Sequence, residues 1–183
     1  MKKMKKTEKV EKIKKIESKK SIAIVPGSFD PITNGHIFII NEAAKRFEKV
    51  YVAVMINAQK QYTFTLEERK RIAQAAVAEI PCVEVIASDG WLYELANTLN
   101  AEAIVKGYRN DFDLEYENKM AEFNRQYAPT VETILIKALP ELESLSSTLI
   151  REKIKNQNDI SDFLPQLAID EIKKIIANSS SIE

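Results

Sequence analysis

The chain has 183 residues, equal numbers of basic and acidic side chains (27 each), one histidine and one cysteine. This length suits one domain with a sizeable core, and a single cysteine excludes an intrachain disulfide. No stretch contains the roughly 18 uncharged apolar residues that a membrane span needs, and no apolar run typical of a secretory signal follows the Lys-rich start. We therefore expect a cytoplasmic protein with no membrane partner.

The zero net charge conceals an uneven distribution. Residues 1–20 carry ten Lys and three Glu, so the other residues hold 17 basic and 24 acidic side chains. A basic segment can bind nucleic acid or an anionic membrane, but a solvated extension, disordered or helical, is the simpler interpretation. The acidic body has no basic face interleaved with aromatic residues, so we expect no nucleic-acid partner. We interpret residues 1–20 as an extension, 21–178 as one domain and 179–183 as a tail.

Short β-branched segments alternate with longer segments of helical periodicity. In chain order, the pattern predicts strand 21–25, helix 36–47, strand 50–56, helix 65 to about 79, strand 83–87, helix 91–99, strand 103–105, helix 112–127, strand 131–137, helix 146–155 and a helix after Pro165. Thr65 and Glu68 form a capping box, and Asp89 and Ser146 are candidate helix caps. The alternation predicts a Rossmann-like α/β fold, a five-stranded parallel sheet with helices on both faces.

Polar side chains follow several of these strands. In an open parallel sheet, ligands bind beyond the carboxyl ends of the strands. The segments after the first, second, fourth and fifth strands are therefore expected to converge on one crevice. They contain Ser28 and His36, then Lys60, then Lys106 and Arg109, and finally residues 146–148.

The turn over residues 27–36 (GSFDPITNGH) joins the first strand to a helix. A helix start offers unpaired N–H groups and a positive dipole end, which suit phosphate, and Gly27 and Gly35 allow close approach of a ligand. The turn is neither a Walker A loop nor a G-x-G-x-x-G fingerprint. Taken alone, His36 is equally a phosphate donor or a helix-start residue that hydrogen-bonds to its own loop.

Two motifs resemble those of a known superfamily. TNGH (33–36) resembles the (H/T)-x-G-H motif of nucleotidyltransferases, and SSTLIR (146–151) resembles their second signature. The segments PGSFDPITNGH (26–36), FTLEER (64–69), KGYR (106–109), DLEYE (113–117), MAEFNR (120–125) and DFLP (162–165) resemble the bacterial phosphopantetheine adenylyltransferases over about residues 20–170.

This resemblance implies a fold of the adenine nucleotide α-hydrolase/nucleotidyltransferase type. It also implies transfer of the adenylyl group of ATP to 4′-phosphopantetheine, which gives dephospho-coenzyme A and pyrophosphate in the penultimate step of coenzyme A synthesis. A homohexamer, Mg²⁺ carried on ATP and coenzyme A as a feedback ligand are further expectations from the family. The substrate phosphate is already an anionic nucleophile, so we expect direct in-line attack without a covalent intermediate.

The resemblance also implies a set of site residues. The expected catalytic residues are His36, Lys60 and Lys106, and no protein ligand for a metal is expected. The expected ATP contacts are Pro26, Gly27, Ser28, Phe29, His36, Gly107, Arg109, Glu117, Ser146, Ser147, Thr148 and Arg151. The expected phosphopantetheine contacts are Ser28, Lys60, Trp91, Leu92, Lys106, Phe123 and Asn124. The family usually has arginine at position 106 and leucine at 91.

Simpler roles exist for several of these residues. In these alternatives, Lys60 is a solvated lysine, Ser146 caps a helix, and Arg151 pairs with a carboxylate on its own helix. Likewise, Glu117 is an exposed carboxylate, and Trp91 and Phe123 are core aromatics. Other functions are an enzyme acting on nicotinate mononucleotide or glycerol phosphate, a catalytically silent nucleotide-binding module, and an interaction protein governed by its basic tail. Residues 106–125 favour the phosphopantetheine enzyme, and the retained cationic residues favour catalysis.

Overall fold

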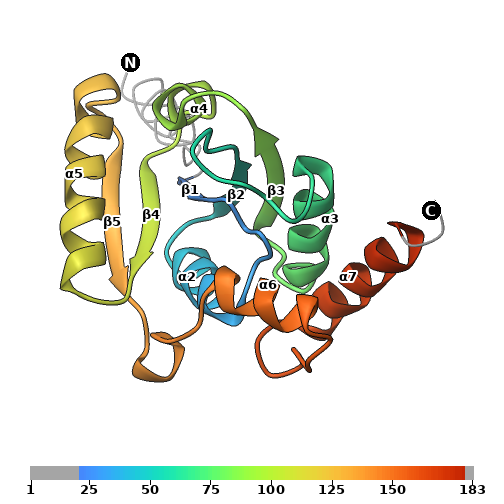
Figure 1. The fold of residues 1–183 in the computed structure, drawn as a ribbon. Helices are drawn as coiled ribbons and strands as arrows, with labels where there is room; N and C mark the ends of the chain where they lie inside the picture. The colour runs from blue at the N-terminus through green and yellow to red at the C-terminus, as the bar shows by residue number, and fades with distance from the viewer. Residues whose placement is uncertain (1–20, 180–183) are drawn as a thin grey trace, which may run out of the picture.

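The computed structural model describes residues 21–179, so the predicted extension (1–20) and residues 180–183 of the predicted tail lie outside the described residues. Five parallel strands form one sheet in the order β3-β2-β1-β4-β5, with helices on both faces (Figure 1). The predicted Rossmann-like α/β class is thereby confirmed. None of the helices in the described range is long and apolar enough to cross a membrane.

The elements follow one another as strand and helix along most of the chain. The strands are β1 (Ile22–Gly27), β2 (Lys49–Met55), β3 (Val83–Ser88), β4 (Ala103–Tyr108) and β5 (Glu132–Lys137). The helices are α2 (Asn34–Ala44), α3 (Leu66–Ala76), α4 (Leu92–Thr98), α5 (Asp111–Tyr127), the short 3-10 helix η1 (Pro140–Leu142), α6 (Ser147–Lys155) and α7 (Gln166–Ser179).

Strand alternation explains the two layers of the core. Successive residues of a strand point to opposite faces, so Ala23 and Val25 belong to one hydrophobic cluster and Ile24 to the other. The larger cluster combines strand residues with residues of α2, α3, α6 and α7, and α7 packs on α3, whereas the smaller one includes Ala96 of α4 and Ala128 at the end of α5. Both faces of the sheet are therefore covered, as a parallel sheet requires.

The chain changes direction across the sheet at β1. β2 and β3 lie on one side of β1, and β4 and β5 lie on the other. β1 pairs with β2 along all six of its residues, but with β4 only at Ala23 and Ile24. The carboxyl ends of β1 and β4 therefore separate, which opens the sheet edge at the switch point where α/β folds bind ligands.

Three local predictions differ from the structure. The first strand does not end at Pro26, because its pairing with β2 continues through Gly27, and β4 runs on to Tyr108 because its pairing with β5 continues. Asp89 does not cap α4, since the helix begins one residue later than expected and Trp91 is its N-cap residue. The capping box of Thr65 and the Ser146 cap are confirmed by their hydrogen bonds.

Candidate functional site

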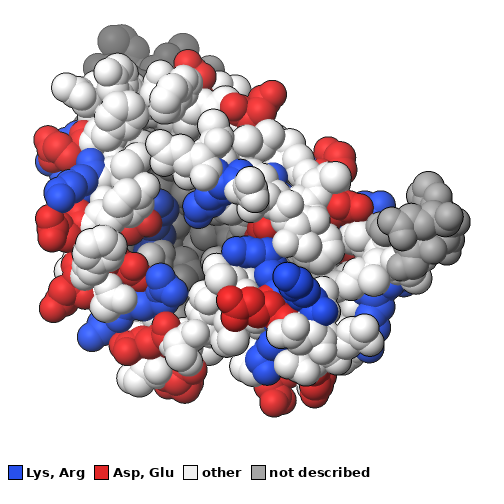
Figure 2. Space-filling model, in the orientation of Figure 1, with Lys and Arg blue, Asp and Glu red and all other residues white. Residues whose placement is uncertain are grey.

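A cavity of about 750 Å³ lies at the carboxyl edge of the sheet. Its walls come from the ends of β1 and β4, the loops after β1, β2 and β5, and the starts of α2, α5 and α6. Figure 2 shows this hollowed face with Lys and Arg side chains gathered around the opening. The predicted convergence of the strand-end segments is therefore confirmed.

The expected catalytic and ATP-binding residues all line this cavity. They are Pro26, Gly27, Ser28, Phe29, His36, Lys60, Lys106, Gly107, Arg109, Glu117, Ser146, Ser147, Thr148 and Arg151. Segments separated by more than 100 residues in the sequence thus share one surface. The contact that each residue makes with a ligand stays a prediction.

The hydrogen bonds of His36 determine which of its ring nitrogens can donate. His36 occupies the third position of α2, and its Nδ1 accepts a hydrogen bond from the Thr33 backbone N–H at 3.0 Å. A backbone amide only donates, so Nδ1 carries the lone pair and the neutral ring holds its proton on Nε2. The histidine therefore bonds to its own loop, as one alternative proposed, and still offers a donor to a ligand.

The surroundings of His36 keep its ring neutral. Burial is the main cause, and the positive charges of Arg109 and Lys60 add to it, so the pKa of His36 falls from 6.5 to about 4. The Phe29 ring also packs edge-on against the imidazole, with centroids 5.1 Å apart. At neutral pH, His36 is therefore a hydrogen-bond donor without a formal charge.

The single histidine makes this shift directly measurable. We expect its Cε1 proton resonance in the ligand-free protein to titrate with a pKa of about 4. The unfolded chain takes up this proton near pH 6.5, so the contribution of His36 to stability falls as pH drops from 6.5 towards 4 and is constant above that window. An NMR midpoint near 6.5 would show that neither burial nor the two cations act on the ring.

Lys60 is exposed in the loop between β2 and α3, and it forms no ion pair within residues 21–179. Its backbone N–H donates to the Asn57 carbonyl at 2.9 Å. The Tyr62 hydroxyl accepts from the Asn57 N–H at 2.6 Å, which closes the same loop. Lys60 therefore lies at the cavity wall in a loop that its own hydrogen bonds hold together, and its ammonium group is available to an anionic ligand.

Two other cations of the cavity already have carboxylate partners. Lys106 Nζ lies 2.5 Å from Glu117 Oε2, and Arg109 Nε donates to Asp113 Oδ2 at 2.8 Å. The hydrogen bond from Arg109 lowers the pKa of the Asp113 carboxyl. Glu117 is not an exposed carboxylate, since its side chain is only 13% exposed. A phosphate group would have to compete with these two carboxylates for the cations.

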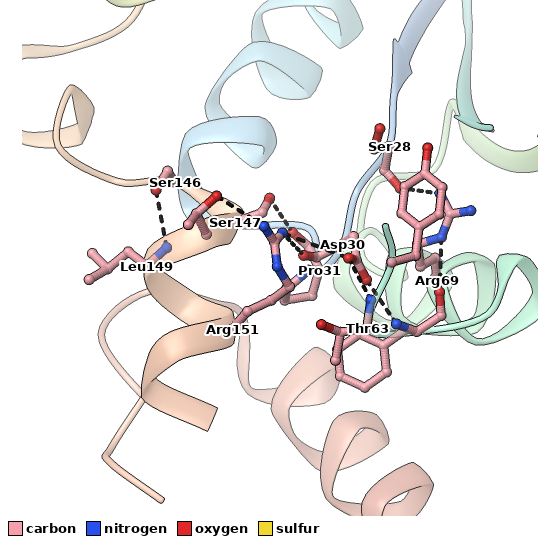
Figure 3. A network of polar contacts seen from close by, with 12 residues as sticks. Ser28, Asp30, Pro31, Thr63, Arg69, Ser146, Ser147, Leu149 and Arg151 are labelled. Carbon is pink, nitrogen blue, oxygen red and sulfur yellow. Dashed lines mark hydrogen bonds and ion pairs between the residues drawn. The ribbon is translucent and has the colours of Figure 1, made fainter. Parts of the chain in front are cut away.

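The start of α6 is attached to the loop after β1. Arg151 Nη1 donates to the Asp30 carbonyl at 2.8 Å, and Ser147 Oγ donates to the Pro31 carbonyl at 2.8 Å (Figure 3). The alternative in which Arg151 pairs with a carboxylate of its own helix is wrong, because its charged partner is Asp30, 3.7 Å away. Two motifs distant in the sequence are therefore joined at the cavity.

Two buried charged residues beside the cavity were missed as functional candidates. Asp30 accepts hydrogen bonds from the N–H groups of Thr63 and Phe64, and Arg69 donates to three backbone carbonyls. Arg69 did leave a signal, because it shares the core-facing stripe of α3 with Ile72 and Ala73. No periodicity marks Asp30, which lies in a loop.

Four predicted phosphopantetheine contacts lie outside the cavity lining: Trp91, Leu92, Phe123 and Asn124. Trp91 is 60% exposed and stacks on Tyr93, with centroids 6.0 Å apart, so it is not a core aromatic. Leu92 packs against the smaller hydrophobic cluster, and Asn124 is buried. Their contact with a pantetheine arm stays a prediction.

Residues 21–179 contain no group of three His, Cys, Asp or Glu side chains placed to hold a metal ion. The cavity lining combines apolar side chains and three carboxylates with four cations, Lys60, Lys106, Arg109 and Arg151, and with hydroxyl and imidazole donors. Such an arrangement suits the oxygens of a polyphosphate, which attract cations and donors alike. Chemically, the site can bind and orient phosphate groups.

Comparison with known proteins agrees with this chemistry. The family model described as cytidylyltransferase-like matches residues 24–153. A phosphopantetheine adenylyltransferase of Lactobacillus helveticus is 42% identical over 159 residues, covering 86% of this chain and 97% of that protein. Proteins of the same name from Streptococcus gordonii and Caldanaerobacter subterraneus are also 42% identical, covering 84% and 82% of this chain and 94% of each relative.

Proposed function

The chain belongs to the family of phosphopantetheine adenylyltransferases, and from this premise we propose that it transfers the adenylyl group of ATP to 4′-phosphopantetheine. A phosphate oxygen of phosphopantetheine forms the new bond to the α-phosphorus of ATP. The bond from this phosphorus to the bridging oxygen of the β-phosphate breaks, and pyrophosphate leaves with the electron pair. The products are dephospho-coenzyme A and pyrophosphate.

The observation that carries this proposal is the set of donors around one cavity at the sheet edge. In the proposed mechanism, His36 donates from Nε2 to an oxygen of the α-phosphate, where negative charge rises in the transition state. It does not act as a base, because its Nδ1 is already occupied by the Thr33 N–H. No base is needed, since the attacking phosphate is already an anion.

The cations divide the remaining work by position. Lys60, which has no carboxylate partner in the described chain, is proposed to span the attacking phosphate and the α-phosphate. Lys106 is proposed to neutralise charge on the attacking phosphate and the α-phosphate, either after its ion pair with Glu117 breaks or while it contacts both Glu117 and a phosphate. Arg109 is proposed to bind the β- and γ-phosphates. The β- and γ-phosphates are proposed to bind at the N-terminus of α6, where the positive end of the helix dipole and the Ser146–Thr148 segment attract anions.

The proposed nucleotide substrate is ATP that carries Mg²⁺ on its triphosphate oxygens. Mg²⁺ keeps several waters and needs few protein ligands, which is compatible with the cavity residues of the described chain. The ion would neutralise charge on the leaving pyrophosphate. The homohexamer and coenzyme A as a feedback ligand stay predictions from the family, and the cytoplasmic location stays a prediction from the sequence.

A direct assay tests the proposed function. Incubation of the full chain with Mg²⁺, ATP and 4′-phosphopantetheine is expected to release pyrophosphate and to form dephospho-coenzyme A, detected by mass spectrometry. Parallel incubations contain nicotinate mononucleotide or glycerol phosphate (with CTP) as the acceptor and are expected to release none. Pyrophosphate release with either of these acceptors, but not with phosphopantetheine, would refute the assignment.

A further inference from the structure

Arg69 of α3 is among the largest fully buried side chains of the described protein, with only 1% of its surface exposed. A buried guanidinium is costly unless it is hydrogen-bonded or paired. Within residues 21–179, Arg69 forms no ion pair with a carboxylate. Backbone carbonyls and one aromatic ring surround it instead.

The three carbonyls belong to three different segments. Arg69 Nη1 donates to the carbonyl of Ser28, just after β1, at 2.6 Å, and to that of Met55, the last residue of β2, at 3.0 Å. Its Nε donates to the carbonyl of Phe64, just before α3, at 3.2 Å. One planar cation therefore joins the two loops that leave β1 and β2 (Figure 3).

The Tyr62 ring covers one face of the planar guanidinium. Arg69 Cζ lies 3.9 Å from the centroid of the Tyr62 ring, a cation–π distance. The Tyr62 hydroxyl bonds to the Asn57 N–H, and the Lys60 N–H bonds to the Asn57 carbonyl. The position of Arg69 is thus coupled through Tyr62 to the loop that carries Lys60.

On the β1 side, Arg69 supports a segment in an unfavourable conformation. Phe29, which follows Ser28, has a φ of 47°, in the left-handed region that bulky residues avoid. Such a backbone persists only where its surroundings hold it. The bond from Arg69 to the Ser28 carbonyl acts immediately before this residue, and Ser28 and Phe29 both line the cavity.

We propose that Arg69 is a positioning residue for adenylyl transfer, which rests on the proposed function. Arg69 holds the Ser28 carbonyl and the Tyr62 ring at once. It thereby sets the distance between two parts of the cavity wall: the segment after β1 that contains Ser28 (the Ser28 wall) and the loop after β2 that contains Lys60 (the Lys60 wall). Lys60 is proposed to bind the attacking phosphate, and Ser28 is an expected phosphopantetheine contact. A displacement of about 1 Å at reacting groups can cost about 10²-fold in rate, so Arg69 acts on turnover without touching a substrate.

The test replaces Arg69 by lysine, which keeps the charge but cannot reach several carbonyls in one plane. We expect Arg69→Lys to lower kcat by about 10- to 100-fold while the KM for ATP changes by less than about threefold. The matched control is Arg71→Lys on the same helix, because the Arg71 side chain is half exposed and, within residues 21–179, bonds only to Glu171 of α7. This control is expected to keep wild-type kinetics.

A double-mutant cycle with Lys60→Ala separates positioning from simple destabilisation. If Arg69 acts through the Lys60 wall, the kcat losses of Arg69→Lys and Lys60→Ala do not multiply in the double variant. Multiplicative losses, or a wild-type kcat in Arg69→Lys, would overturn the inference. Tyr62→Leu replaces Arg69→Lys in the cycle if the latter does not fold. A wild-type protein inactive towards phosphopantetheine would instead refute the proposed function.

Discussion

Replacement of His36 by alanine is expected to lower kcat by about 10²–10³-fold, which corresponds to about 2.7–4 kcal/mol of lost transition-state stabilisation. The dissociation constant for ATP is expected to change little, because the donor matters most when charge develops on the α-phosphate. The structure supplies the reason for this asymmetry. The ring is neutral at pH 7 and held by the Thr33 N–H, so it attracts the ground-state triphosphate only weakly.

Two measurements make the His36 result interpretable. The ATP dissociation constant is measured by calorimetry, and kcat by pyrophosphate release, on the same preparation of His36→Ala. His36→Gln is the companion variant, since its side-chain amide offers an N–H donor and is expected to recover part of the lost rate. A large loss of affinity with an unchanged kcat would show that His36 only binds the nucleotide.

Replacement of Asp30 by alanine is expected to lower the free energy of unfolding by about 3–5 kcal/mol, as for a broken buried charge network. The Asp30 carboxylate is 2% exposed and accepts from the N–H groups of Thr63 and Phe64 at 2.9 and 3.0 Å. Without it, these two amides lose their acceptor and the Arg151 guanidinium loses its charged neighbour. Urea unfolding monitored by circular dichroism measures the loss.

Two further variants bracket the Asp30 prediction. Asp30→Asn retains one carbonyl oxygen and the size of the side chain, so its loss is expected to be smaller. Asp89→Ala removes an exposed carboxylate for which no bond is seen in the described structure, and a change within about 0.5 kcal/mol is expected. A loss below about 1 kcal/mol in Asp30→Ala would show that the carboxylate does not tie the loops together.

The fold was predictable because its signals are local. β-branched runs alternate with helical periodicity, and the capping box of Thr65 marks the start of α3 within a few residues. Strand ends were less predictable, because pairing decides them. Gly27 and Lys106 look like loop residues in the sequence, but the neighbouring strands continue beside them and extend β1 and β4.

The cavity was predictable in outline and not in its internal bonding. Parallel topology alone brings the polar strand ends together, so the convergence of Ser28, Lys60 and Arg109 needed no long-range information. Ion pairs depend on distances that a sequence does not contain. The partners Glu117 and Asp113 of the cavity cations, and the link from Arg151 to Asp30, therefore emerged only from the structure.

Buried charge was the least predictable feature. Arg69 belongs to a helix rich in Glu, Arg and Lys, where a solvated arginine is the ordinary expectation. Its burial follows from three carbonyls, those of Ser28, Met55 and Phe64, which its side chain reaches from the first turn of α3. Trp91 is the opposite case. Its apolar side chain suits a hydrophobic core, but it is 60% exposed.

A crystal structure of the full chain with bound dephospho-coenzyme A tests the central claim most directly. We expect the diphosphate of this product to lie in the cavity between β1 and β4. His36 Nε2 and Lys60 Nζ would then lie within hydrogen-bond distance, about 2.7–3.2 Å, of oxygens on the transferred phosphate. A product bound elsewhere, or an imidazole whose Nε2 is turned away from the phosphates, would contradict it.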